Sequence, residues 1–126
     1  MKSVFYIALG GALGALSRYG ISILLKQQNQ ISFPVNTFTI NVIGCLAIGY
    51  FAAHTLKTNQ NQLLIQFVII GLLGGFTTFS AFSLESIQLF KNGKTTIALV
   101  YIFASNIIGL TATIIGFQLH KVIYKV

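Results

Sequence analysis

Four long apolar runs follow one another along this chain of 126 residues, at roughly 3–25, 34–56, 63–90 and 95–123. Each run reaches about 20 residues, the length that an α-helix needs to cross the hydrocarbon core of a bilayer. Only 7% of the residues are charged and 55% are hydrophobic, so the chain has too few charges to cover a soluble surface. The sequence predicts an all-α membrane protein in which residues 1–126 form one domain of four transmembrane helices.

The connectors between these runs are short and polar, at 26–33, 57–62 and 91–94. Short connections favour antiparallel neighbours, so we expect an up-down-up-down bundle. The first run is longer than the apolar core of a signal peptide, and we expect it to be retained as a helix. Because the four helices use nearly the whole chain, the function is expected to reside inside the bundle.

The third run contains a cluster of glycines followed by hydroxyl residues and phenylalanines, GLLGGFTTFSAFS at 71–83. An unpaired backbone amide in hydrocarbon is so unfavourable that non-helical backbone survives there only where protein buries it or where it lines an ion or water site. Broken helices also bind ions near the midplane of the bilayer in transporters. We therefore predict that the third helix is broken at its middle and that the break holds ions.

The eight basic residues divide equally between the two sides of the predicted membrane. Lysine and arginine normally collect in cytoplasmic loops and set the orientation of a membrane protein. An equal division favours insertion in both orientations and pairing of two opposite copies, with one fixed orientation as the alternative. A nucleic-acid partner is not expected, because the cations are scattered. One side is predicted to hold Lys2, Lys57, Lys121 and Lys125, and the other Arg18, Lys26, Lys91 and Lys94.

Small residues at a spacing of four mark two predicted contact faces, Gly10 with Gly14 and Gly71 with Gly75. Cys45, the only cysteine, is interpreted as a packing position. His54 and His120 lie near helix ends, and neither has neighbours in the sequence that indicate a metal site or a catalytic pair.

Glu85 is the single acidic residue, which excludes two-carboxylate chemistry within one subunit. We therefore expect that the protein is not an enzyme.

Polar residues inside the predicted helices mark a pathway, because they are unfavourable in a membrane unless they serve a function. They recur at spacings of three and four, so each set shares one helix face. The alternative for each serine or threonine is a hydrogen bond to its own backbone carbonyl. The three sets are Thr37 and Asn41; Phe79, Phe82, Ser83 and Ser86; and Tyr101, Ser105 and Gly109, with Asn106 as a further polar residue of the last run.

These residue types favour an anion over a cation. The ring edges of Phe79 and Phe82 are weakly positive, the Asn41 amide and the hydroxyls donate hydrogen bonds, and Arg18 attracts anions into a vestibule. Packing in the core is the alternative for the two phenylalanines.

Three motifs in this order resemble the Fluc (CrcB) family of fluoride ion channels. They are GGAxGAxxRY at 10–19, TFxxNxxG at 37–44 and GxxGGxTTFSxFSxE at 71–85. The resemblance extends over nearly the whole chain. It implies passive export of fluoride across the cytoplasmic membrane by an antiparallel, dual-topology dimer with two pores.

The resemblance also implies roles for individual residues. Phe79 and Phe82 are assigned to an aromatic box along the pore, and the carbonyls of Gly74 and Thr77 to a structural sodium ion at the centre of the dimer. The charged vestibule position and the acid beyond the box are assigned to Arg18 and Glu85. The predicted fluoride pathway comprises Asn41, Phe79, Phe82, Tyr101, Ser105, Thr37, Ser80 and Ser83.

Two residues depart from the family pattern. Asn36 stands where glycine is usual, and Ala81 stands where threonine is common, which removes one hydroxyl near the box. Some organisms pair two different family members, but the equal division of charge favours a homodimer.

Two further functions remain as alternatives. A small dual-topology, proton-coupled cation or drug antiporter would need a titratable carboxylate within the helices, and Glu85 lies toward the far end of its run. A non-conducting structural subunit is the third possibility. All three interpretations place the chain in the cell membrane as a multi-pass protein.

Overall fold

A computed structural model describes residues 1–26, 33–55 and 61–124 of the chain. The elements within these residues are all helical, and four spans are long and apolar enough to cross a membrane. This confirms the predicted all-α membrane fold with four helical spans. In chain order the elements are α1 (Lys2–Lys26), α2 (Val35–Thr55), α3 (Gln62–Ile65), η1 (Gln66–Leu73), α4 (Gly74–Phe76), α5 (Phe79–Lys91) and α6 (Thr95–Ile123).

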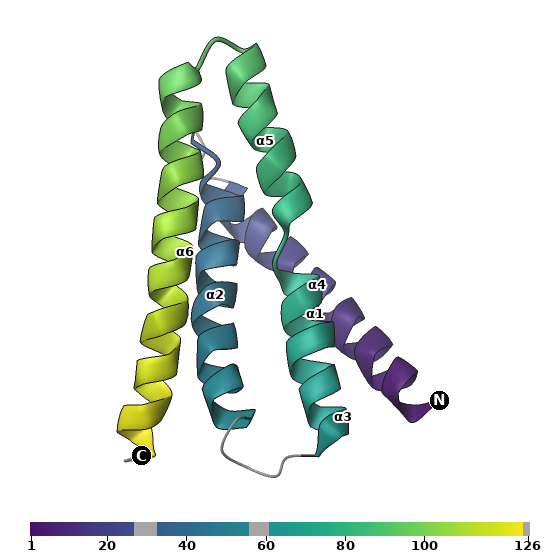
Figure 1. Cartoon of the computed structure of the whole chain (residues 1–126). Coiled ribbons are helices and arrows are strands. Elements are labelled where there is room, and N and C mark those ends of the chain that lie inside the picture. The colour runs from purple at the N-terminus through teal and green to yellow at the C-terminus, as the bar shows by residue number, and fades with distance from the viewer. Residues whose placement is uncertain (27–32, 56–60, 125–126) are drawn as a thin grey trace.

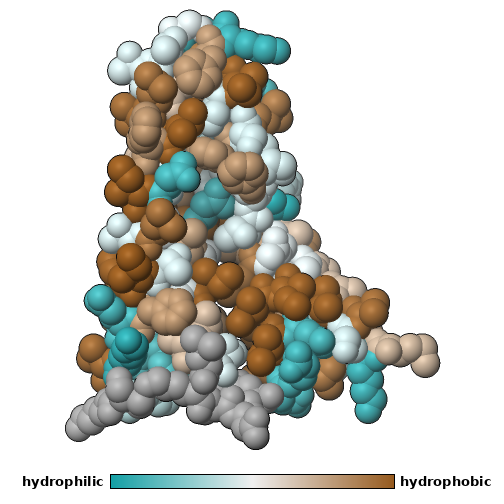
Figure 2. Space-filling view, viewed as in Figure 1, coloured by the Kyte–Doolittle hydropathy of each residue, from teal (hydrophilic) through white to brown (hydrophobic). Residues whose placement is uncertain are grey.

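The spans alternate in direction, as the short connectors predicted (Figure 1). α2 and α6 run parallel and pack side by side, while α1 crosses at an angle and packs against η1 and α4. The two connectors at 26–33 and 57–62 lie mostly outside the described residues, as do Lys57 and Lys125. Hydrophobic side chains cover much of the face shown in Figure 2, with hydrophilic ones near its two ends and a further few near mid-height.

Glycines let α1 approach η1 and α4 closely. A β-carbon on Gly71 would lie 2.7 Å from the Ile7 carbonyl oxygen, and one on Gly75 would lie 2.6 Å from the Gly11 carbonyl oxygen. A β-carbon on Gly10 or Gly14 would likewise collide with backbone atoms of η1. The two contact faces predicted from the spacing of small residues therefore meet each other, which confirms that prediction.

Glycines also allow α2 and α6 to approach each other closely. A β-carbon on Gly49 would collide with the Thr113 carbonyl, and one on Gly116 with the Leu46 carbonyl. Because the two helices run parallel at this close distance, their last turns meet at one end of the molecule (Figure 1). The expectation that neither His54 nor His120 has company indicating a metal site or a catalytic pair did not foresee that the two rings are neighbours in the fold. The Nδ1 atom of His54 lies 3.0 Å from the Nε2 atom of His120.

The turn between α5 and α6 is a glycine-capped helix end. Gly93 has a positive φ of 71°, and the Lys94 N–H donates to the Leu89 carbonyl oxygen at 2.9 Å. This arrangement is typical of a glycine just beyond a helix C-terminus. The turn brings Leu89 against Ala98 and Tyr101, which form a buried cluster with Phe38 and Phe82 packed against it.

Candidate functional site

The third span changes its helical form twice before it is interrupted. η1 is a π-helix of eight residues, and α4 continues from it for three residues. Thr77 and Thr78 then have extended backbone, with ψ angles of 156° and 111°. α5 begins at Phe79, and the Thr78 side chain caps it by accepting a hydrogen bond from the Ala81 N–H at 3.2 Å. The π-helix was not predicted from the sequence, and such segments are frequent at functional sites.

Asn41 on α2 binds both backbone polar groups of Thr78. The Thr78 N–H donates to Asn41 Oδ1 at 2.9 Å, and Asn41 Nδ2 donates to the Thr78 carbonyl at 3.1 Å. In a continuous helix this N–H would donate to the Gly74 carbonyl. The Asn41 side chain therefore replaces the lost helical bonds of Thr78, and the Gly74 carbonyl loses its usual donor.

A cavity of about 330 Å³ lies beside this interruption. Its wall is contributed by α2, η1, α4, α5 and α6, so every span except α1 takes part. Six residues predicted from the sequence lie on this wall: Asn41, Gly74, Thr77, Phe79, Phe82 and Ser105. Asn106, a further polar residue noted on the fourth run, also lies on the wall, and residues without a predicted role complete it: Gly44, Cys45, Ile48, Ile69, Leu73 and Thr78.

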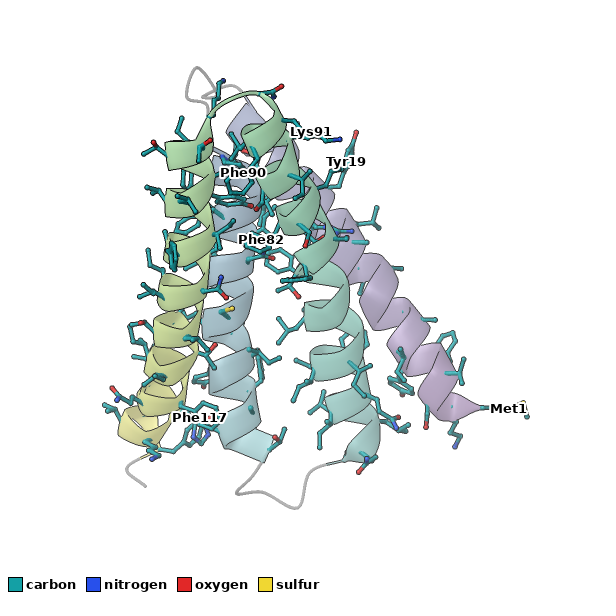
Figure 3. The ribbon with its side chains drawn as sticks, turned by 45° about the horizontal axis from the view of Figure 1, so that its top comes forward. Met1, Tyr19, Phe82, Phe90, Lys91 and Phe117 are labelled. Atoms are coloured by element: carbon teal, nitrogen blue, oxygen red, sulfur yellow. The ribbon has the colours of Figure 1, made fainter. Side chains whose placement is uncertain are left out.

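Three aromatic rings continue from the cavity into the core. The ring centroids of Phe79 and Phe82 are 5.5 Å apart, and those of Phe82 and Tyr101 are 5.1 Å apart. Phe82 reaches from α5 into the space between α5 and α2 (Figure 3). Phe79 is 78% exposed in the single chain, whereas Tyr101 is fully buried. The aromatic line therefore has one uncovered end.

Glu85 joins three helices through its carboxylate. Thr37 on α2 donates to Oε1 at 2.7 Å, and Tyr101 on α6 donates to Oε2 at 2.8 Å. Both donors are buried, with exposed fractions of 6% and 0%. The two hydroxyls that we predicted along the pathway are thus engaged with the acid, and they do not line the cavity.

The predicted serines differ in their hydrogen bonding. Ser83 donates to its own helix at the Phe79 carbonyl, and Ser80 lies 3.2 Å from the Thr78 hydroxyl. Neither lies on the cavity wall. The buried Ser105 Oγ has no hydrogen-bond partner among the residues that the structure describes, although it lies on that wall.

The remaining predicted position, Arg18, lies on α1 and does not line the cavity. Its carbonyl accepts a hydrogen bond from Ser22 Oγ at 2.9 Å. Asn36 Nδ2 donates to the Ser22 carbonyl at 3.4 Å, so this unusual asparagine contacts α1 from the start of α2.

Comparison with known proteins places these features in a family. The profile of a family described as CrcB-like protein, camphor resistance (CrcB), matches residues 5–117. The chain belongs to the CrcB family. The matched residues include Glu85 and all those that line the cavity. Proteins named fluoride-specific ion channel FluC match the chain over nearly their whole length.

Three such relatives illustrate the similarity. The FluC of Flavobacterium psychrophilum is 45% identical over 122 residues, which is 96% of this chain and 98% of the relative. The FluC of Paracoccus denitrificans is 44% identical over 92% of this chain and 93% of its own. The FluC of Aquifex aeolicus is 40% identical over 94% of this chain and 97% of its own.

Asn106 was noted only as a further polar residue of its run, and Thr78 shows why part of the cavity was missed in the CrcB sequence. Asn106 sits on α6 one position after Ser105, and its Nδ2 donates to the Ile102 carbonyl at 2.7 Å, a local bond that indicates no site. Thr78 lies within the motif, but only the interruption reveals that its backbone turns toward α2. The apolar wall residues carry no sequence signal that separates them from ordinary packing positions.

Proposed function

We propose that this chain is a channel that lets fluoride leave the cytoplasm passively through the cell membrane. The observation that carries the proposal is the cavity at the interruption, where Asn41, Phe79, Phe82 and Ser105 converge. Membership of the CrcB family and relatives named as fluoride-specific channels support it. These relatives are named as channels, in agreement with the expectation that the protein is not an enzyme.

The cavity offers donors suited to a small anion. A dehydrated fluoride needs hydrogen-bond donors or positive ring edges in place of its water. The Ser105 hydroxyl has no partner within the described parts of the chain, and the Asn41 amide carries two N–H donors of which Thr78 uses one. Phe79 and Phe82 add apolar surface with positive edges, which excludes water without adding a formal charge.

The conducting unit in this proposal is an antiparallel homodimer inserted in both orientations. Phe79 is 78% exposed in the single chain, although it belongs to the aromatic line, and a second copy would cover it. The start of α1, with Lys2, and the last turn of α6, with Lys121, lie near one end of the bundle, and the α5–α6 turn, with Lys91 and Lys94, lies at the other (Figure 1). A partner that is a different family member is the alternative outcome.

We further propose that a structural sodium ion sits between the two copies at the carbonyls of Gly74 and Thr77. The donor set fits a hard cation, because backbone carbonyl oxygens are typical ligands of such ions. The Gly74 carbonyl lacks its helical donor, and both residues lie on the cavity wall. When bound, the ion would supply positive charge that holds the two interruptions together.

The direction of transport follows from the membrane potential. An inside-negative potential is worth about 2.3 kcal/mol per charge per 100 mV and drives an anion out of the cell. Hydrogen fluoride enters as a neutral acid and ionises inside, so an open anion path is sufficient for export.

The arrangement of Glu85 disfavours the antiporter. Proton-coupled exchange needs a carboxylate that loses its bonds and takes up protons during transport. Both carboxylate oxygens of Glu85, the only acid in the chain, accept buried hydrogen bonds that tie α2, α5 and α6 together.

Efflux from proteoliposomes tests the proposed function. Liposomes loaded with potassium fluoride and containing the purified protein are expected to release fluoride as soon as a potassium ionophore removes the opposing voltage. Fluoride release should occur without a pH gradient, and liposomes loaded with potassium chloride should release no chloride. Release that requires a proton gradient, or no release from correctly assembled protein, would contradict the proposal.

A further inference from the structure

A pair of imidazoles lies where α2 and α6 end, and the proposed channel does not use it. His54 is in the last turn of α2 and His120 is in the last turn of α6. The Nδ1 atom of His54 faces the Nε2 atom of His120 at 3.0 Å. We propose that these two histidines form a binding site for a divalent transition-metal ion of the copper or nickel type.

The distance between the two nitrogens fits such an ion. Imidazole nitrogens bind transition metals at about 2.0–2.1 Å. Two neighbouring ligands at right angles around an ion are then about 2.9 Å apart, whereas tetrahedral ligands are about 3.3 Å apart. The observed 3.0 Å, which is the length of the hydrogen bond between the rings, is close to the right-angled spacing of the square-planar or octahedral sites that Cu²⁺ and Ni²⁺ prefer.

Two tyrosine rings pack around the histidine pair. Tyr124 stacks on His120, with ring centroids 4.6 Å apart and planes inclined by 29°. Tyr50 meets His120 edge-on at 5.5 Å, and Tyr124 also lies 5.5 Å from His54. His120 is buried and His54 is only partly buried, so an ion has access from the side of His54.

The helix geometry independently favours a cation at this position. α2 and α6 run parallel, so their C-terminal ends meet here (Figure 1). The C-terminus of a helix carries a partial negative charge that attracts cations within its last turn. Because the C-termini of α2 and α6 are adjacent, both partial negative charges act on a cation bound between them.

Binding requires only small changes in the protein. In the present arrangement one ring donates its N–H to the other ring nitrogen. When an ion enters, that proton moves to the other nitrogen of the donating ring, so both facing nitrogens become ligands and no net proton is released. Rotation about the broad χ2 torsion of histidine turns both lone pairs toward the ion.

The chain has only two histidines, which makes the test direct. The protein is purified with its affinity tag removed, because a histidine tag binds the same ions. Cu²⁺ or Ni²⁺ is then titrated, and bound metal is measured by equilibrium dialysis. Ni²⁺ serves as a second probe because, unlike Cu²⁺, it is not readily reduced by the thiol of Cys45.

We expect one ion per chain and an electron paramagnetic resonance spectrum of bound Cu²⁺ that shows two equatorial imidazole nitrogens. His54→Gln or His120→Gln should lower the affinity by at least about tenfold, since loss even of a supporting group typically costs that much. Each variant should leave one nitrogen in the spectrum. Lys121→Gln, also in the last turn of α6, is the matched control and should bind as the wild type does.

Two results would overturn the proposal. One is a wild-type spectrum without two imidazole nitrogens, a result that does not depend on the folding of any variant. The other is equal affinity in the wild type and in the double variant His54→Gln/His120→Gln. Neither measurement involves fluoride, so failure of the metal site and failure of the proposed channel are distinguishable.

Discussion

At the scale of single residues, several side chains around the interruption have hydrogen-bond partners that their spacing in the sequence does not indicate. Asn41 is occupied by the backbone of Thr78, and Thr37 and Tyr101 are occupied by Glu85. Phe82 is the predicted residue that connects the two groups, because it lines the cavity and its ring centroid lies 5.1 Å from that of Tyr101.

Phe82→Ile is expected to lower the fluoride flux at least tenfold while the dimer stays assembled. Isoleucine keeps the apolar volume approximately but has no ring edge to present to an anion. Flux is measured by fluoride electrode in proteoliposomes, and assembly by size-exclusion chromatography. Phe5→Ile, at an exposed position of α1, is the control and should conduct normally. Undiminished flux in the Phe82 variant would remove this ring from the mechanism.

Tyr101→Phe should destabilise the protein by about 1 kcal/mol, a typical value for a polar contact between membrane helices. The change deletes the hydroxyl that donates to Glu85 Oε2 and leaves that oxygen without this donor. The free energy of unfolding is measured by titration with a denaturing detergent. Tyr19→Phe, at a side chain that is 67% exposed, is the matched control and should be neutral. Equal stability of both variants would show that the Tyr101 bond contributes nothing.

At the scale of elements, glycines determine which helices touch. α1 packs on η1 and α4, and α2 packs on α6, in both cases through positions where a β-carbon would collide with backbone. The π-helix η1 lies between the first of these contacts and the cavity, since Gly71 faces α1 and Ile69 faces the cavity. Packing at α1 therefore positions the interruption, even though α1 does not line the cavity.

Gly75→Leu is expected to prevent correct assembly, because any side chain at this position meets the backbone of Gly11. The yield of monodisperse protein from detergent extracts measures the effect. Gly20→Leu on α1, the helix that packs against Gly75, is the control, because a β-carbon on Gly20 has no atom within 4 Å. Normal yield from the Gly75 variant would mean that α1 can shift without loss of the fold.

At the scale of the whole molecule, a single chain exposes residues that the proposed pathway requires to be buried. Phe79 is largely exposed, and Gly74 beside the interruption is exposed as well. A second copy in the opposite orientation would bring the two interruptions together at the level of the midplane. The membrane-embedded assembly, and not the single chain, is therefore the functional unit in our proposal.

Dual topology predicts that about half of the copies expose the α5–α6 turn to each side of the membrane. Asn92→Cys in a Cys45→Ala background places one thiol in this exposed turn. Intact cells treated with a membrane-impermeant maleimide should label about half of the protein, and lysed cells nearly all of it. Labelling of all or none of the copies in intact cells would establish a single orientation and require a different partner chain.

The sequence by itself determined the class, the number of spans and the family, because apolar length and small-residue spacing act locally along the chain. It also identified six residues on the cavity wall, since glycines, hydroxyls and phenylalanines at the interruption are distinctive. Only the tertiary structure decided the partners of Asn41, Glu85 and His54, because hydrogen bonds between helices depend on their relative rotation and depth. That information is absent from the spacing of residues within any single helix.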